Sequence, residues 1–203
     1  MNLSVQVNRT QLNEVKRMFK DMKGVPEKVI SRAINGTLSG VKTDTSTEAR
    51  KVLNAGKKAI DKNISTNKAS VSRLTGVVSI KGNIIPLSEF KPTQTQKGVT
   101  ARVYKGQPRE SYTSAFIATL KTGHKGVFWR TYKGKPVGRI VRRPWPLMER
   151  KYRFPIEAVY GPRLTTVVKS DSVMKPVMNN AGTRLDKNLK KEINYEMSKM
   201  GAK

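Results

Sequence analysis

Hydrophobic residues near the N-terminus first alternate with polar ones and then recur at helical spacing. Residues 2–7 alternate and predict a short strand. A first helix follows, for which Asn8 or Thr10 is a suitable N-cap and Gly24 a suitable end. The apolar face of this helix comprises Leu12, Val15, Phe19 and Met22.

A second, longer helix is predicted to start at Pro26, which fits a first helical turn, and to end at Asn54–Gly56. Gly36 and Gly40 weaken its middle, so we expect either a kink or a close contact with another helix there. Residues 57–69 fit a short polar helix or a loop, and their pattern does not decide between the two.

From Ser70 onward the apolar pattern changes to a period of two residues. Glycine-containing turns separate six candidate strands: Leu74–Ile80, Ile84–Phe90, Val99–Tyr104, Ala115–Leu120, Val127–Tyr132 and Val137–Val141. Short strands at spacings of about ten residues favour an antiparallel sheet.

The last third of the chain begins with prolines and ends in a helix. Residues 144–162 contain four prolines and predict an extended loop or arm, because proline cannot donate to a sheet ladder. Ser170 or Asp171 opens the final helix. The apolar stripe of that helix comprises Val173, Val177, Ala181, Leu185, Leu189, Ile193 and Met197.

These patterns predict an α+β fold with N-terminal helices, a mainly antiparallel twisted β-sheet, an extended proline-rich arm and a C-terminal helix. We expect one structural domain overall. Along the chain it divides into an N-terminal strand and helices (1–61), a basic β-rich core (62–143), an extended arm with a strand (144–169) and the C-terminal helix (170–203).

The charge of the chain is strongly positive and unevenly spread. The net charge is +27, and residues 62–148 hold 17 Lys and Arg against two acids, Glu89 and Glu110. Self-repulsion of this size opposes a compact state, so we expect a neutralising partner. Either nucleic-acid phosphates or an acidic protein surface would serve.

The absence of cysteine excludes disulfides and thiolate chemistry, and no apolar run is long enough for a membrane span, so we expect a soluble protein made in the cytoplasm.

Residues for catalysis are sparse. The single histidine, His124, lies in a Gly-His-Lys-Gly turn and is interpreted as a turn residue that donates a hydrogen bond. The sequence has no phosphate-binding glycine loop and no local carboxylate set for a divalent metal. We therefore expect no enzymatic activity, no cofactor and no metal site.

Aromatic residues and arginines are interleaved between residues 128 and 154. The aromatics are Phe128, Trp129, Tyr132, Trp145, Tyr152 and Phe154. Such a pattern can form a stacking platform for single-stranded nucleic acid. The favoured interpretation is that Phe128 and Trp145 fill the core while arginines border it.

Two sets of candidate contact residues follow from the local density of charge and from the apolar residues of the proline-rich arm and the last helix. The candidates for an acidic partner or DNA are Arg102, Lys105, Lys125, Arg130, Arg139, Arg142 and Arg143. The candidates for a contact between subunits are Trp145, Phe154, Leu185, Leu189, Ile193 and Met197.

A series of short segments resembles, in order, the minor tail protein Z family of phages and prophages, the tail completion proteins. The segments are Ile85–Phe90, Gln94–Val99, Arg102–Gly106, Ala115–Leu120, Gly123–Phe128 and Val159–Pro162. The N-terminal half fits more loosely, at Arg32–Asn35 and Thr47–Arg50, and neither residues 144–154 nor the last helix match.

The resemblance implies a non-enzymatic component of the virion that completes the tail and joins it to the head. It implies a homo-oligomeric ring at the head-proximal end, hexameric by analogy with small neck and tail-terminator proteins. The implied partners are other tail tube, terminator or neck proteins, and double-stranded DNA is an open alternative for the basic surface. Charge alone suggests another function, a sequence-nonspecific nucleic-acid-binding protein.

Overall fold

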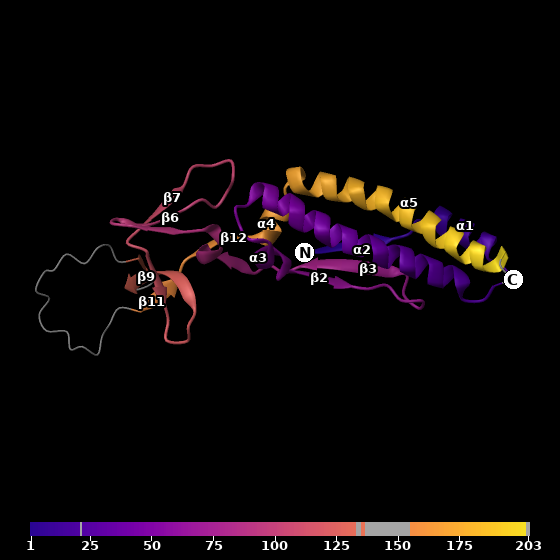
Figure 1. The fold of residues 1–203 in the computed structure, drawn as a ribbon, viewed down its shortest axis with the longest axis horizontal. Coiled ribbons are helices and arrows are strands. Elements are labelled where there is room, and N and C mark those ends of the chain that lie inside the picture. Colours follow the sequence, from indigo (N-terminus) through magenta and orange to yellow (C-terminus); the bar gives the residue numbers. More distant parts are fainter. Residues whose placement is uncertain (21, 133–134, 137–154, 202–203) are drawn as a thin grey trace, which may run out of the picture. The chain divides into compact units, whose positions relative to one another are not determined.

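The chain forms two compact units, each assembled from segments that are distant in the sequence. The structure, a computed structural model, describes residues 1–20, 22–132, 135–136 and 155–201 (Figure 1). Unit 1 contains Met1–Ala49, Ile60–Asn83 and Leu164–Lys203, and unit 2 contains Arg50–Ala59 and Ile84–Arg163. The chain therefore leaves unit 1 and returns to it twice.

The sheet of unit 1 is antiparallel, with strand order β1-β3-β2. Its strands are β1 (Asn2–Gln6), β2 (Ile64–Asn67) and β3 (Thr75–Ile80). The central strand pairs Val78 with Leu3 on one side and with Thr66 on the other. Alternate residues of β3 are buried, which is the period-two pattern that predicted this strand.

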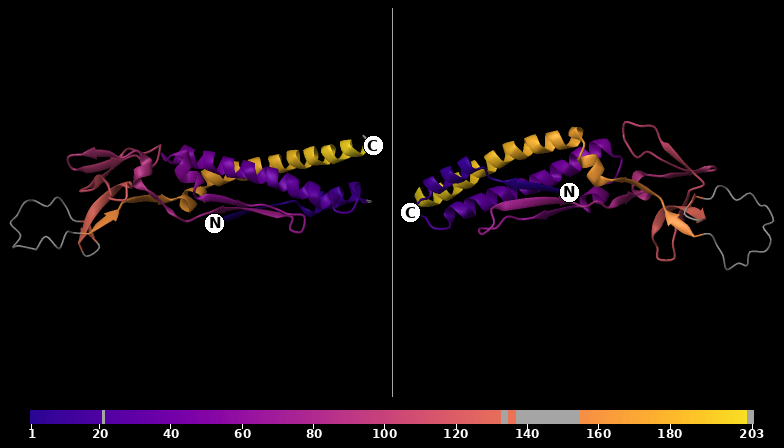
Figure 2. Two further views of the ribbon diagram at one scale, coloured as in Figure 1. Left: turned by 60° about the horizontal axis from the view of Figure 1, so that its bottom comes forward. Right: turned by 180° about the vertical axis from the view of Figure 1, so that it is seen from behind.

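Helices make up the rest of unit 1. They are α1 (Arg9–Met18), α2 (Val25–Val52, whose last residues belong to unit 2), α4 (Leu164–Val168) and α5 (Asp171–Gly201). Helix α2 packs on the sheet at Gly76, where an added Cβ would lie 2.5 Å from Leu38 Cδ1 and 2.9 Å from Ile34 Cγ2. Both views of Figure 2 show α5 running alongside α2. The predicted N-terminal and C-terminal helices are thus present, and the structure shows that they pack together.

The start of α1 forms as the sequence predicts. Asn8 Oδ1 accepts a hydrogen bond of 2.7 Å from the Gln11 backbone N–H, and Gln11 Oε1 accepts one of 3.3 Å from the Asn8 N–H. This capping box satisfies two amides that the first helical turn leaves without partners. The helix ends at Met18 with Phe19 as its C-cap, earlier than predicted, and Gly24 precedes α2 in a left-handed conformation with φ +76°.

The glycines in the middle of α2 mark a close helix contact, one of the two predicted alternatives. Asn188 of α5 lies 3.1 Å from the position of a Cβ at Gly36, and its Nδ2 donates a 3.0 Å hydrogen bond to Thr37 Oγ1. Arg184 of α5 lies against Gly40 in the same manner. Small residues here let polar side chains of α5 approach the α2 backbone.

Unit 2 consists of small antiparallel sheets. A two-stranded sheet joins β4 (Ile84–Pro86) to β12 (Tyr160–Arg163), and the 3₁₀ helix Leu87–Phe90 follows β4. A second sheet has the order β5-β6-β7, with β5 (Thr93–Thr95), β6 (Gly98–Ala101) and β7 (Glu110–Thr113). The third sheet is centred on β9 (Lys125–Tyr132), which pairs with β8 (Phe116–Thr119), β10 (Lys135–Pro136) and β11 (Ile156–Ala158).

The mixed α+β class and the antiparallel pairing are confirmed, but the single sheet that we expected is replaced by several small ones. One reason is that predicted strands are interrupted. The strand predicted over Ile84–Phe90 ends at Pro86, and the 3₁₀ helix after it is followed by Lys91 at φ 50°. The undecided residues 57–69 form the short helix α3 (Lys57–Asp61) and strand β2.

The residues that the structure describes include no proline-rich arm of the kind we predicted. The strand predicted at Val137–Val141 and residues 144–154 of the arm lie outside the described residues. The described remainder is strand β11, strand β12 and helix α4. Within the described residues, no helix combines the length and hydropathy that crossing a membrane requires.

Candidate interaction surface of the basic unit

Positive charge is concentrated in unit 2. Its residues include 21 Lys and Arg against four Glu and no Asp, a net charge of +17. Unit 1 is longer, yet its 20 Lys and Arg and ten acids give a net charge of only +10. A binding surface for an anionic partner is therefore to be sought first on unit 2.

Two of the predicted contact residues follow strand β6 and are held by a fixed backbone. Arg102 and Lys105 are both exposed. The Arg102 carbonyl accepts a 3.1 Å hydrogen bond from Asn54 Nδ2, and the Lys105 N–H donates a 2.9 Å hydrogen bond to the Val52 carbonyl. The backbone is thereby anchored while both side chains remain accessible to a partner.

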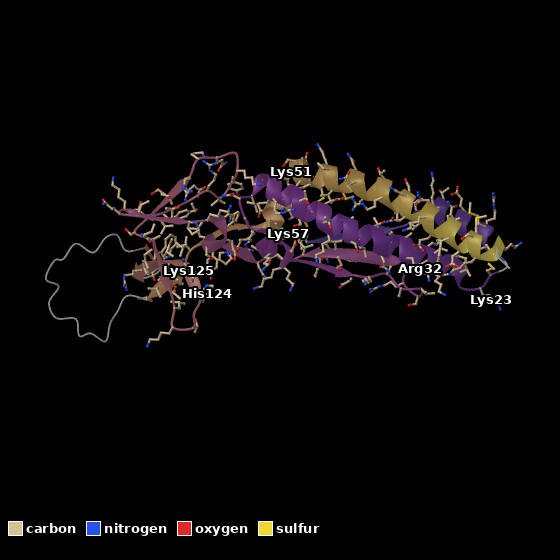
Figure 3. All side chains as sticks on the ribbon, viewed as in Figure 1. Lys23, Arg32, Lys51, Lys57, His124 and Lys125 are labelled. Carbon is tan, nitrogen blue, oxygen red and sulfur yellow. The ribbon has the colours of Figure 1, made fainter. Side chains whose placement is uncertain are left out.

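Two further candidates lie on β9. Lys125 begins the strand beside His124, as Figure 3 shows, and Arg130 lies near its other end; both are exposed. The Arg130 guanidinium carbon lies 5.5 Å from the centroid of the Phe116 ring, a cation–π contact that also serves folding. The remaining candidates, Arg139, Arg142 and Arg143, lie outside the described residues.

Arg109 shows that not every cation of unit 2 is available for binding. Its guanidinium donates to the Lys91 carbonyl at 3.3 Å, to Thr93 Oγ1 at 2.8 Å and to the Thr100 carbonyl at 2.9 Å. These bonds tie strands β5 and β6 to the residue that follows the 3₁₀ helix. The sequence pattern alone carries no signal that distinguishes this structural arginine from its exposed neighbours.

An open pocket of about 370 Å³ lies beside Lys125. Its lining comprises Ser88, Glu89, Pro92, Ile117, Lys125, Gly126 and Val127. The pocket offers one carboxylate and one ammonium group on an otherwise mixed surface. Among the described residues, no three His, Cys, Asp or Glu side chains are grouped closely enough to hold a metal ion.

His124 lies in the turn between β8 and β9, as predicted. Its backbone carbonyl accepts a 2.9 Å hydrogen bond from the Leu120 N–H, and Gly123 donates a bond of 2.9 Å to the Leu120 carbonyl. In this hydrogen bond His124 accepts through its backbone carbonyl, whereas we predicted that His124 donates one. The imidazole ring is exposed at this turn.

Glu110, one of the few carboxylates of unit 2, accepts a hydrogen bond from a tyrosine on its own strand. The Tyr112 hydroxyl donates a 2.6 Å hydrogen bond to Glu110 Oε2 on β7. Burial of the hydroxyl, and then this bond to an anion, raise the pKa of Tyr112 well above its ordinary value. Glu110 thus stabilises the neutral phenol of Tyr112.

The aromatic residues of β9 contribute to the core, as the favoured interpretation predicted for Phe128. Phe128 is buried and its ring centroid lies 6.3 Å from that of Phe116. Trp129 is half-buried, and its Nε1 is fully enclosed. Trp145, Tyr152 and Phe154 lie outside the described residues. A stacking platform for bases on β9 would therefore lack Phe128.

The candidate subunit contacts on α5 differ in accessibility. Leu185 and Leu189 are buried within the chain's own fold, because this part of α5 packs on its own unit. Ile193 is half-buried and Met197 is 51% exposed. Burial therefore leaves the last turns of α5 as the part of the predicted stripe that a second chain can reach. Trp145 and Phe154 are outside the described residues.

The six segments that carry the resemblance to tail completion proteins all lie in unit 2, and hydrogen bonds join two pairs of them. Leu87 donates a 3.0 Å backbone hydrogen bond to the Val159 carbonyl, and Gln94 Oε1 accepts a 2.8 Å bond from the Ile117 N–H. Comparison with protein-family models, curated proteins and solved structures finds no match to this chain.

Proposed function

We propose that the protein is a non-enzymatic structural component of a tailed phage, which completes the tail and joins it to the head. The observation that carries this proposal is the net charge of +17 on unit 2, with exposed cations on anchored backbone. The resemblance supports the same function, since its segments form much of unit 2.

In this proposal the basic surface docks on an acidic neighbour in the tail or neck. Opposite charges steer such proteins together and fix their orientation. The alternative neighbour inside a particle is the end of the packaged DNA. A strongly basic channel wall would grip DNA and slow its ejection, so we favour an acidic protein as the partner that neutralises unit 2.

The subunits would form a ring around the tail axis. The half-buried Ile193 on α5 is the member of the predicted subunit-contact set that we assign to the contact between neighbours in this ring. A ring of six is the expectation from analogy with neck and tail-terminator proteins, and analogy alone supports it.

Charge-matched variants test which unit carries the function. The triple variant Arg102→Ala, Lys105→Ala, Lys125→Ala removes three exposed cations from unit 2. Its control, Lys62→Ala, Lys68→Ala, Lys81→Ala, removes three exposed cations from unit 1. Each is expressed in host cells carrying a phage genome that lacks the gene, and joined particles are counted by electron microscopy.

We expect the unit 2 variant to leave tails unjoined and the control to restore joined particles. Equal recovery with both variants would contradict the assignment of the basic surface. Circular dichroism of the purified variants checks that both retain the helical content of the parent.

The same charge distribution supports a second function, sequence-nonspecific nucleic-acid binding. Each neutralised phosphate releases counterions, so DNA affinity should fall steeply as salt rises. Saturable binding of duplex DNA at physiological salt, lost in the unit 2 triple variant and retained in the control, would favour this second function. Binding that salt does not weaken would exclude it.

A further inference from the structure

We infer that the end of unit 1, where α5 terminates, is a second interaction surface. It binds an acidic segment of a partner protein whose apolar side chains insert into a pocket. This inference is independent of the function proposed for unit 2. It depends on a pocket, on exposed methionines and on the local charge.

The pocket has a volume of about 240 Å³ and lies between the α1–α2 connection and the last turns of α5. Its lining comprises Met22, Val25, Glu196, Lys199 and Met200. Figures 1 and 2 show the α1–α2 connection and the C-terminal end of α5 at the same end of unit 1. The pocket therefore joins residues that are far apart in the sequence.

Methionines are unusually accessible around this pocket. Met22 is 38% exposed and Met200 37% exposed, and Met197, one turn before Met200 on α5, is 51% exposed. We call Met22, Met197 and Met200 the methionine surface. Methionine is unbranched and polarizable, so it adapts to varied apolar partners, and large exposed apolar groups in one place indicate an interaction site.

The carboxylates next to the methionine surface are already neutralised within unit 1. Arg32 Nη1 lies 2.7 Å from Glu196 Oε1 and 3.9 Å from Glu192 Oε2. Lys199 Nζ lies 3.8 Å from Glu196 Oε1 and 4.2 Å from the centre of the Tyr195 ring. A partner would therefore meet little uncompensated negative charge here.

The segment that leads into the pocket is basic. Residues 16–23 contain Lys16, Arg17, Lys20 and Lys23 against one acid, Asp21, and these four cations are exposed. Figure 3 places Lys23 at the end of unit 1 where α5 terminates. Exposed cations around an apolar pocket complement a partner that presents apolar side chains among carboxylates.

Charge decides between the possible occupants. A second copy of the chain would bring two basic segments 16–23 together, and unit 1 as a whole carries a net charge of +10. Like charges placed opposite each other disfavour that contact. An acidic helix with leucine anchors would fill the pocket and neutralise the lysines at once.

Synthetic peptides and the full chain test the inference. The probe is a helical peptide of about 18 residues with leucines at i, i+3, i+4 and i+7 and glutamates on the other faces. A second peptide replaces the leucines with alanine. Both will bind unit 2 through charge, so the readout must be local: peptide affinity by fluorescence anisotropy, and oxidation of each methionine by hydrogen peroxide, measured by mass spectrometry.

We expect the leucine peptide to protect Met22, Met197 and Met200 from oxidation and to leave Met178, which is 55% exposed on the same helix, unprotected. Met200→Gln should lower the affinity for the leucine peptide by about tenfold, because the substitution removes apolar area from the pocket. The matched variant Met178→Gln should bind as the parent does.

Several results would overturn the inference. Equal protection by the alanine peptide would mean that charge alone binds the probe. Unchanged affinity in Met200→Gln would remove the pocket from the interaction. Protection of the methionine surface by self-association of the chain, or by vesicles of anionic phospholipid but not by the leucine peptide, would identify a different occupant.

Discussion

The guanidinium of Arg184 on α5 occupies the space beside Gly40 on α2 that a Cβ at Gly40 would fill. From there Arg184 reaches Asp44, with Nη2 3.1 Å from Oδ2. Glycine within a helix costs roughly 1 kcal/mol relative to alanine. The contact between the two helices accounts for a glycine at this position.

The coupling between these two residues is measurable. Gly40→Ala alone should not stabilise the protein, because the new methyl group displaces Arg184 from Asp44. In the background of Arg184→Ala the same change should stabilise unit 1 by up to about 1 kcal/mol, the helix-propensity gain. Urea unfolding followed by far-UV circular dichroism measures the effect of Gly40→Ala in the parent and in Arg184→Ala, since α2 and α5 supply most of the helix.

Gly182 provides the control for this cycle. Apart from the adjoining residues and the backbone of the helix itself, no atom lies within 4 Å of the position of a Cβ there, and the residue is on the same helix as Arg184. Gly182→Ala should therefore stabilise by about 1 kcal/mol with or without Arg184. If Gly40→Ala stabilises the parent as much as Gly182→Ala does, the described packing of Arg184 is wrong.

Unit 2 depends on a close approach of the same kind. A Cβ at Gly161 on β12 would lie 2.6 Å from Cε2 of Phe90, whose side chain is fully buried. Gly161→Ala should destabilise unit 2 by about 1–3 kcal/mol, because the ring must move within a packed core. Trp129 lies on β9 in unit 2, so its fluorescence reports the unfolding of this unit.

Gly106, also in unit 2, is the matched position with open space. Apart from Gly106 itself and its two chain neighbours, no atom lies within 4 Å of the point that a Cβ would occupy there. Gly106→Ala should therefore change the unfolding free energy by less than about 0.5 kcal/mol. Equal destabilisation by both alanine variants would contradict the contact between Gly161 and Phe90.

Alkaline pH should destabilise unit 2 through Tyr112. Burial and the bond to Glu110 raise its pKa, so the folded state keeps the phenol proton while the unfolded chain releases it near the ordinary value of 10.0. The unfolded state then binds fewer protons, and stability falls as pH rises above 10.0. In Tyr112→Phe this loss is absent, so tryptophan-monitored urea midpoints should fall less steeply there. Parallel pH profiles for parent and variant would contradict the raised pKa.

The sequence predicted the elements with strong periodicity and local caps. Asn8 caps α1 because its side chain and that of Gln11 need only local geometry, and Pro26 fits the first turn of α2 for the same reason. Strand β5 was missed because Thr93–Thr95 is polar throughout and exposed on every residue. Its hydrogen bonds to β6 give it order, and the hydrophobic pattern cannot show them.

The candidate site was predicted in part. Local charge density identified the exposed Arg102, Lys105 and Lys125, but it could not exclude that a cation such as Arg109 is held by backbone carbonyls. The helical periodicity of the apolar residues predicted α5 correctly. Periodicity cannot show, however, whether Leu185 packs against its own chain or against another. That depends on α2, which is distant in sequence and close in space.

In the function that we propose, a neighbouring macromolecule in a phage tail neutralises the positive surplus of this chain. The most direct measurement is cryo-electron microscopy of particles made with and without the gene, with the chain tagged at its N-terminus. We expect a ring of tagged density at the head-proximal tail end, unit 2 against acidic neighbours, and unjoined tails when the gene is absent. Complete, joined particles without the gene, and a tagged chain that stays free of particles, would contradict it.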